Sequence, residues 1–273
     1  MEEENIVNIE RLIRSKNPRL AKFLPRFILK YLKRILHEKE LNSFFNENKN
    51  IQNQEFCTKL LESFNVKIII RGIEYIPKEG PVILAMNHPL GGMDAAALIS
   101  ALKDHRRDLK FIVNDLLLNL PFLKTMFVGV NKFGKNKITV RQQISEAFNA
   151  DHALCIFPAG KVSRKVKGKI EDLEWKRTFV VYARDLNRDI IPIFIDGELS
   201  KFFYRLSNFR EFIGIKSNIE MFYLADELHK QKNKTFTFTV GKPINISQEY
   251  SSLSDNEATL KIREKLYALK KEV

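Results

Sequence analysis

The segment from Val82 to Asp94 contains the residues of this chain that are best suited to acid–base chemistry. It reads Val-Ile-Leu-Ala-Met-Asn-His-Pro-Leu-Gly-Gly-Met-Asp, an apolar run followed by a loop that opens on a histidine and closes on an aspartate. An imidazole titrates near neutral pH, and a neighbouring carboxylate fixes its tautomer and stabilises its charged form. His88 is therefore a candidate catalytic base, and Asp94 is the candidate group that orients it.

Two glycines, Gly91 and Gly92, lie between these residues. They lack a Cβ and so permit the positive φ values with which the loop can fold Asp94 back toward His88. Two structural roles compete with this interpretation. Asp94 is a suitable N-cap for a helix expected over residues 95–103, and a histidine at the end of a strand often serves only the fold. The segment alone leaves both interpretations open.

A second segment, from Leu154 to Arg164, reads Leu-Cys-Ile-Phe-Pro-Ala-Gly-Lys-Val-Ser-Arg. It is again a strand that breaks into a Pro/Gly loop, now followed by basic residues. Five cations fall within nine residues here: Lys161, Arg164, Lys165, Lys167 and Lys169. Such a run is usually a solvated loop, and the alternative is that it holds an anionic donor or head group.

These two segments and a third, Ile191-Pro192-Ile193, resemble in order the motifs of the glycerolipid (lysophospholipid) acyltransferase family. That family has an Asn-His-x4-Asp motif, a Phe-Pro-Glu-Gly motif followed by Ser and Arg, and an apolar-Pro strand. The resemblance implies that His88 and Asp94 form a catalytic dyad that deprotonates a lipid hydroxyl as it attacks an acyl thioester. Loop N–H groups around Gly160 are expected to support the oxyanion. The residues expected to bind substrate are Asn87, Gly91, Gly92, Lys132, Phe157, Pro158, Gly160, Lys161, Ser163 and Arg164.

Three departures from the family pattern bear on the identity of the acceptor. Five residues rather than four separate His88 from Asp94, and Ala159 stands where the family has Glu. The usual Arg after Gly129 is absent, and Lys132 is the first basic residue that follows this glycine. In the family, that Glu and that Arg are associated with the head group of a glycerol phosphate acceptor, so their absence argues against this acceptor.

The variant pattern Asn-His-Pro-x-Gly-Gly-x-Asp with Phe-Pro-Ala-Gly resembles the branch of bacterial ornithine-lipid and glycine-lipid O-acyltransferases. Residues 172–176 and 195–204 are further matches to that branch. The resemblance implies acyl transfer from acyl carrier protein or CoA to the 3-hydroxy group of a lyso-glycine or lyso-ornithine lipid. The alternatives are a 1-acylglycerol-3-phosphate acyltransferase, a thioesterase-like hydrolase, and a non-catalytic binder of an anionic surface or nucleic acid. We expect no nucleic-acid partner, because the sequence has no signature of a nucleic-acid-binding module.

The net charge of +13 at pH 7 indicates an acidic partner or surface. Residues 11–37 hold nine Lys or Arg and no acidic residue, and from Pro25 onward apolar residues recur at helical spacing opposite basic ones. Such a basic amphipathic helix is expected at an anionic membrane surface. The alternative is a helix that packs its apolar stripe on the core and exposes its basic face.

We predict a peripheral protein on the cytoplasmic face of the membrane. No secretory leader is visible, and the most apolar stretch, residues 111–130, is interrupted by polar residues. No cofactor is expected beyond the thioester co-substrate, because the sequence has no metal-ligand spacing, P-loop or dinucleotide fingerprint. The two cysteines, Cys57 and Cys155, suggest no disulfide framework and fit a reducing compartment.

The pattern along the chain predicts an α/β fold with a central, largely parallel sheet flanked by helices and an N-terminal basic helical segment. We predict a membrane-surface segment over residues 1–60 and an acyltransferase domain over residues 61–273. From Val66 onward, strand-like and helical stretches alternate, which is typical of a parallel sheet. Strands are expected over 66–71, 81–86, 110–113, 127–130, 153–157, 189–195 and 235–240. Helices are expected over 95–103, 139–150 and 174–186, and after a capping box formed by Ser254 and Glu257.

Overall fold

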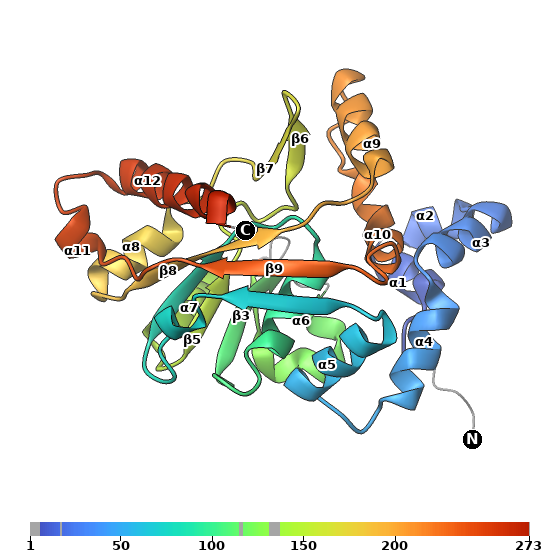
Figure 1. The fold of residues 1–273 in the computed structure, drawn as a ribbon. Coiled ribbons are helices and arrows are strands. Elements are labelled where there is room, and N and C mark those ends of the chain that lie inside the picture. Colours follow the sequence, from blue (N-terminus) through green and yellow to red (C-terminus); the bar gives the residue numbers. More distant parts are fainter. Residues whose placement is uncertain (1–5, 17, 115–116, 131–136, 273) are drawn as a thin grey trace. The chain divides into compact units, whose positions relative to one another are not determined.

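A computed structural model describes residues 6–16, 18–114, 117–130 and 137–272 of the chain (Figure 1). The chain forms two compact units. One comprises Met1–Ile51 and Leu199–Lys232, and the other comprises Gln52–Glu198 and Asn233–Val273. The functional boundary expected at residue 60 stays a prediction.

The second unit is built on a seven-stranded sheet with the strand order β1-β9-β8-β2-β5-β3-β4. Neighbouring strands are parallel except for β8 and β9, which are antiparallel. This arrangement confirms the predicted α/β fold with a largely parallel sheet. The strands are β1 (Lys67–Arg71), β2 (Val82–Met86), β3 (Leu109–Asn114), β4 (Phe127–Val130), β5 (Ala153–Ile156), β8 (Ile190–Asp196) and β9 (Thr235–Val240). Two short strands, β6 (Arg164–Val166) and β7 (Lys169–Glu171), form a separate antiparallel hairpin.

Helices of the second unit pack on this sheet and on one another. α5 (Asn53–Ser63) packs on α6 (Gly92–Ala101), and α12 (Asp255–Ala268) packs on β8 and on α8 (Thr178–Asp185). The predicted capping box of Ser254 and Glu257 is present at the start of α12. The other elements of the unit are α7 (Lys137–Asn149), α11 (Ile246–Glu249), and the 3-10 helices η1 (Ile73–Tyr75), η2 (Leu117–Asn119), η3 (Pro121–Met126) and η5 (Leu269–Glu272).

The helix that the sequence predicts from residue 174 begins later, at Thr178. Trp175 therefore precedes the helix, although its ring is 5% exposed and belongs to the core as predicted. The reason for the later start is local. The indole N–H of Trp175 donates to the side chain of Asp172 at 2.9 Å, which holds this stretch in a non-helical loop.

The central strand β2 is covered on both faces. Its residues are at most 1% exposed, and it pairs in parallel with β5 on one side and with β8 on the other. A strand buried on both faces needs apolar side chains at every position, which explains the unbroken run Val-Ile-Leu-Ala-Met. Because successive side chains alternate, Ile83 and Ala85 join the core formed with α8 and α12, and Leu84 and Met86 point to the opposite face. The carboxyl end of β2 places the His88 loop at the edge where open α/β sheets bind ligands.

The first unit is helical. It contains α1 (Ile9–Lys16), α2 (Pro18–Phe23), α3 (Arg26–Ile35), α4 (Glu38–Glu47), α9 (Lys201–Phe212), η4 (Ile219–Tyr223) and α10 (Leu224–His229). The apolar stripe of the basic helix α3 is covered only in part, since Ile35 is 9% exposed whereas Phe27 is 73% exposed. Within the described residues, no helix is both long enough and apolar enough to cross a membrane.

Candidate active site

The loop after β2 brings the side chains of His88 and Asp94 into contact. β2 ends at Met86 and α6 begins at Gly92, so the chain reverses within a short loop. Gly91 makes this reversal possible with a φ of 70° and a ψ of −131°, a conformation that residues with a Cβ rarely adopt. The His88 Nδ1 atom lies 2.8 Å from the Asp94 Oδ2 atom. The extra residue between His88 and Asp94 is thus compatible with a hydrogen bond between them.

Asp94 is not the N-cap of α6, so the capping alternative considered from the sequence is wrong. Gly91 holds the N-cap position, and Asp94 lies in the first turn. The Asp94 Oδ2 atom accepts a hydrogen bond from the Leu90 N–H at 2.9 Å in addition to the bond with His88. Both hydrogen bonds of the carboxyl group are therefore directed to the loop rather than to the backbone of its own helix.

Burial of Asp94 dominates the electrostatics of the pair. The side chain is 0% exposed, and burial raises the pKa of its carboxyl group, although the hydrogen bond and charge of His88 and the Leu90 N–H oppose the shift. The Asp94 Oδ1 atom has no hydrogen-bond partner among the described residues. When Asp94 is ionised, its carboxylate only accepts hydrogen bonds, and His88 Nδ1 then carries the proton of the shared bond. The Nε2 atom of a neutral His88 is then left as an acceptor.

Phe157 fixes the ring of His88 from a second direction. The two rings stack with their centroids 4.0 Å apart and their planes at 21°. The His88 side chain is 18% exposed, so part of the imidazole stays accessible from outside the protein. One ring face and one ring edge are thus held, and a substrate can reach the remaining surface.

Asp172 links the two segments that the sequence singled out, although it was not among the predicted site residues. Its Oδ1 atom accepts from the backbone N–H of His88 at 3.1 Å and from the hydroxyl of Ser163 at 2.6 Å. The Ser163 N–H in turn donates to the His88 carbonyl at 2.8 Å. Burial raises the pKa of the Asp172 carboxyl group, and the hydrogen bonds from the Ser163 hydroxyl and the His88 N–H oppose the shift. The only signal was the match of residues 172–176 to the O-acyltransferase branch, which names no role.

Two predicted substrate-binding residues have backbone partners. Asn87 is 3% exposed, donates to the Ile195 carbonyl at 2.9 Å and accepts from the Ile195 N–H at 2.7 Å, which ties the end of β2 to β8. The Gly160 N–H donates to the Phe157 carbonyl at 2.8 Å and closes the turn. The role expected of loop N–H groups around Gly160 in supporting the oxyanion stays a prediction. The substrate contacts of both residues stay predictions.

The basic residues after Gly160 divide into three sets. Arg164 is 2% exposed and donates to the Val162 carbonyl at 2.6 Å, whereas Lys161 is exposed. Lys165, Lys167 and Lys169 lie on the β6–β7 hairpin, which stands apart from the large sheet in Figure 1.

The remaining predicted substrate-binding residues lie in the two loops or outside the described residues. Gly92 is exposed at the start of α6, and the carbonyl of the buried Pro158 accepts a hydrogen bond from the backbone N–H of Lys176. Lys132 lies outside the described residues, and the substrate-binding roles of all these residues stay predictions.

A cavity of about 330 Å³ opens beside the His88 loop. Its walls come from the carboxyl ends of β2 and β8, from the start of β9 and from the C-terminal segment, and they include Asn87, Pro89, Ser163, Asp196, Lys234 and Lys270. The cavity therefore presents both signs of charge next to the candidate dyad. Among the described residues, no three His, Cys, Asp or Glu side chains are grouped so as to hold a metal ion.

Comparisons with known proteins agree with the motifs. A family model described as acyltransferase matches residues 11–273. Lyso-glycine lipid O-acyltransferases from Bacteroides thetaiotaomicron and Phocaeicola vulgatus are 42% and 40% identical over 240 residues, covering 88% of this chain and 88% and 86% of theirs. The solved 1-acyl-sn-glycerophosphate acyltransferase PlsC from Thermotoga maritima has a TM-score of 0.49 and 18% identity, covering 95% of this chain and 91% of that chain. The family match and the two relatives confirm the resemblance found in the sequence.

The role of Asp172 can be tested by removing its carboxyl group. We expect Asp172→Ala to lower the free energy of unfolding by roughly 3 kcal/mol or more, because three donors lose their partner and each buried donor left unpaired costs about 1–3 kcal/mol. Urea denaturation at pH 7, followed by circular dichroism, measures this change. Asp185→Ala, at an exposed aspartate on α8, is the control and should stay within about 0.5 kcal/mol of the wild type. Equal stability of the two variants would show that Asp172 does not anchor the loops.

Proposed function

This chain belongs to the acyltransferase family, and on that premise we propose that it transfers a fatty acyl group from a thioester to the 3-hydroxy group of a lyso-glycine lipid. The observation that best supports this proposal is the 2.8 Å contact between His88 and the buried Asp94 at the carboxyl end of the central strand. The choice of acceptor is supported by the two relatives, which are named for lyso-glycine lipid. Lyso-ornithine lipid is the alternative amino-acid acceptor.

In the proposed reaction, His88 acts as a general base and no protein nucleophile is needed. The Nε2 atom accepts the proton of the acceptor hydroxyl while the hydroxyl oxygen attacks the thioester carbonyl carbon. A C–O ester bond forms, the C–S bond breaks, and the proton held by His88 leaves with the thiol. Asp94 keeps the proton of the neutral ring on Nδ1 and stabilises the imidazolium that forms. Loop N–H groups around Gly160 are proposed to support the oxyanion.

The acyl donor is proposed to be acyl carrier protein or CoA, with no further cofactor. Both donors are anionic, and the exposed cations of the β6–β7 hairpin follow the Phe157 turn directly in sequence. Opposite charge raises the rate of encounter between such partners, especially at low salt. The hairpin is therefore the surface we assign to the donor.

We propose that the protein binds its lipid acceptor at an anionic membrane surface, from the cytoplasmic side. The basic helix α3 carries Arg26, Lys30, Lys33 and Arg34 and buries only part of its apolar stripe. Each basic residue near an anionic surface contributes about 1 kcal/mol of attraction. A peripheral protein attached in this way reaches its acceptor without crossing the bilayer.

Replacing His88 and Asp94 one at a time distinguishes the role of the base from the role of the group that orients it. We expect His88→Ala to abolish acyl transfer and to leave the fold intact, because the side chain is partly exposed. Asp94→Asn is expected to lower turnover by about 10³–10⁴-fold. The amide can donate to His88 Nδ1 and move the ring proton to Nε2, and the equivalent change in a serine protease triad costs about 10⁴. Near-normal turnover by folded His88→Ala protein would contradict the mechanism.

The same Asp94→Asn variant has a predicted dependence of stability on pH. Because the folded-state pKa of Asp94 is raised by burial, its ionised form destabilises the wild type above that pKa, and the penalty disappears as pH falls below the unfolded-state value. We therefore expect the variant to match or exceed the wild-type free energy of unfolding at pH 7 and to lose this advantage near pH 4. Urea titrations across this range measure the difference. A variant that is less stable than the wild type at pH 7 and as stable as the wild type at low pH would contradict this prediction.

The acceptor assignment predicts an order of specificity constants. We expect kcat/KM for an N-acyl glycine carrying a 3-hydroxy fatty acid to exceed that for lysophosphatidic acid. If Lys161 pairs with the acceptor carboxylate, Lys161→Ala should lower the first constant by roughly 10–100-fold, as for a charged hydrogen bond of about 1.5–3 kcal/mol. Lys261→Ala, at an exposed lysine of α12, is the matched control. A clear preference for lysophosphatidic acid would favour the 1-acylglycerol-3-phosphate acyltransferase function instead.

The basic helix predicts salt-sensitive binding to anionic vesicles. Replacing Arg26, Lys30, Lys33 and Arg34 with Gln should weaken binding by about 4 kcal/mol at low salt, from about 1 kcal/mol per cation. Vesicle sedimentation measures the change. A control with the same net charge, in which Lys59, Lys103, Lys124 and Lys261 of the second unit are replaced, should bind nearly as well as the wild type. Equal weakening of both variants would show that net charge, and not α3, directs the protein to the membrane.

A further inference from the structure

Helix α9 has one side buried within the first unit and large apolar side chains exposed on the opposite side. Its inner side is buried, with Phe203, Tyr204, Ser207 and Arg210 at most 5% exposed. On its outer side, Phe202, Phe209 and Phe212 are 46%, 60% and 88% exposed. These three residues lie on one face of the helix, because positions separated by seven or by three residues are neighbours on its surface. Large apolar side chains exposed together mark a binding surface or a membrane contact.

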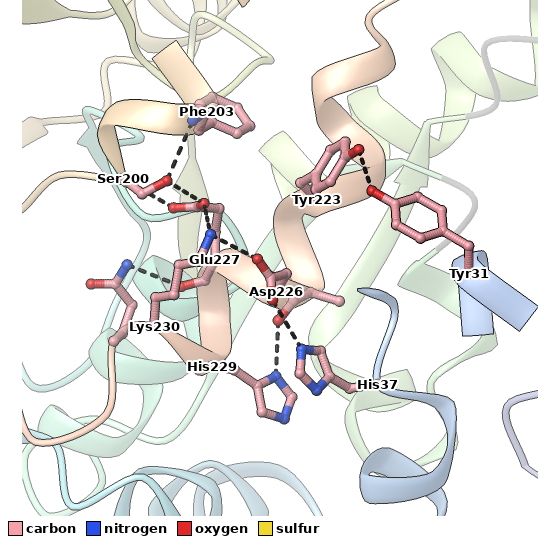
Figure 2. A network of polar contacts seen from close by, with 11 residues as sticks. Tyr31, His37, Ser200, Phe203, Tyr223, Asp226, Glu227, His229 and Lys230 are labelled. Carbon is pink, nitrogen blue, oxygen red and sulfur yellow. Dashed lines mark hydrogen bonds and ion pairs between the residues drawn. The ribbon is translucent and has the colours of Figure 1, made fainter. Parts of the chain in front are cut away.

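The inner side of α9 is anchored within the first unit, so the outer phenylalanines are not exposed by poor packing. The Arg210 Nε atom lies 2.9 Å from Glu220 Oε2, and Glu220 is 0% exposed. At the start of the helix, Ser200 caps α9 by accepting from the Phe203 N–H. The Ser200 N–H and hydroxyl both donate to the buried Glu227 at 2.6 Å (Figure 2). Rotation of α9 that hid its phenylalanines would break these bonds.

The exposed face of α9 continues onto α3 through two tyrosines. The ring of Phe202 meets that of Tyr223 edge to face, with centroids 4.9 Å apart. The Tyr223 and Tyr31 hydroxyls are 2.7 Å apart, as Figure 2 shows. Tyr31 is 39% exposed, and Phe27 lies one helical turn before it on α3. We call Phe27, Tyr31, Phe202, Phe209 and Phe212 together the aromatic strip.

Cations border the aromatic strip on both helices. Lys201, Arg205 and Lys216 are exposed on or just after α9, and Arg26, Lys30 and Arg34 are exposed on α3. The Arg34 guanidinium lies 5.4 Å from the centre of the Tyr31 ring. The carboxylate of α9, Glu211, lies 2.9 Å from Arg210. Aromatic side chains bordered by cations match the boundary of an anionic bilayer, where rings enter the apolar layer and cations meet the head groups.

We infer that the aromatic strip is a membrane-insertion surface, with Phe209 and Phe212 entering the acyl layer of an anionic bilayer. This surface adds apolar insertion from a segment near residue 210 to the electrostatic attraction of α3. The inference rests on the proposed function only in taking the acceptor to be a membrane lipid. It predicts that part of the binding survives at high salt, because screening weakens charge attraction but not apolar burial.

Insertion can be measured with tryptophan reporters. The native Trp175 is 5% exposed and gives a constant background. In Phe212→Trp, fluorescence should be quenched by anionic vesicles whose acyl chains are brominated. Leu260→Trp, at a 56% exposed leucine on α12, is the control and should not be quenched. Absence of quenching in vesicle-bound Phe212→Trp, or equal quenching of both reporters, would overturn the inference.

A second variant tests what insertion contributes. Phe209→Ser/Phe212→Ser should reduce binding to anionic vesicles at high salt by roughly tenfold or more, whereas Leu260→Ser should not. Acyl transfer to an acceptor embedded in vesicles should fall, and transfer to a short-chain monomeric acceptor should be unchanged. If the wild type transfers to neither acceptor, the proposed function fails, yet the quenching result still decides insertion. If the wild type is instead a dimer in sedimentation velocity that the double variant dissociates, without quenching, the strip is a protein interface.

Discussion

The hydrogen bond between His88 and Asp94 depends on a carboxyl group that is removed from water. Burial makes the ionised form of Asp94 unfavourable, and its Oδ1 atom has no partner among the described residues to offset that effect. The same burial leaves the imidazole as the main group with which the carboxylate can interact, so the orientation of the ring is strongly specified. Gly91, the Leu90 N–H and the stacked Phe157 all serve to maintain this one contact.

The rest of the site is a frame that keeps two loops in register at the carboxyl end of the sheet. Asn87 joins the end of β2 to β8, and Asp172 joins the His88 loop to the Ser163 loop. These contacts are hydrogen bonds between buried groups, which become costly when one partner is lost. This frame holds the His88 loop through backbone hydrogen bonds and leaves the imidazole free for the proposed reaction. The aromatic strip and the basic helix have a separate proposed role, which is contact with the lipid surface.

The sequence predicted what depends on neighbouring residues. An unbroken apolar run, two glycines and an acid within six positions of a histidine were enough to predict the central strand and the contact of His88 with Asp94. Contacts between distant residues were not predictable in this way. Asp172 lies 84 positions from His88 and Asn87 lies 108 positions from Ile195, and no local pattern marks either pairing. The grouping of residues 199–232 with the N-terminal helices was missed for the same reason.

The tautomer of His88 is the most direct test of this account. Nitrogen-15 NMR of histidine-labelled protein at a pH where the ring is neutral distinguishes a protonated Nδ1 from a protonated Nε2. We predict that His88 in the wild type carries its proton on Nδ1 and that Asp94→Asn moves it to Nε2. A wild-type His88 protonated on Nε2 would contradict the proposed mechanism, because the ring's lone pair would then lie on Nδ1, which contacts Asp94, and Nε2 could not accept the proton of the acceptor hydroxyl.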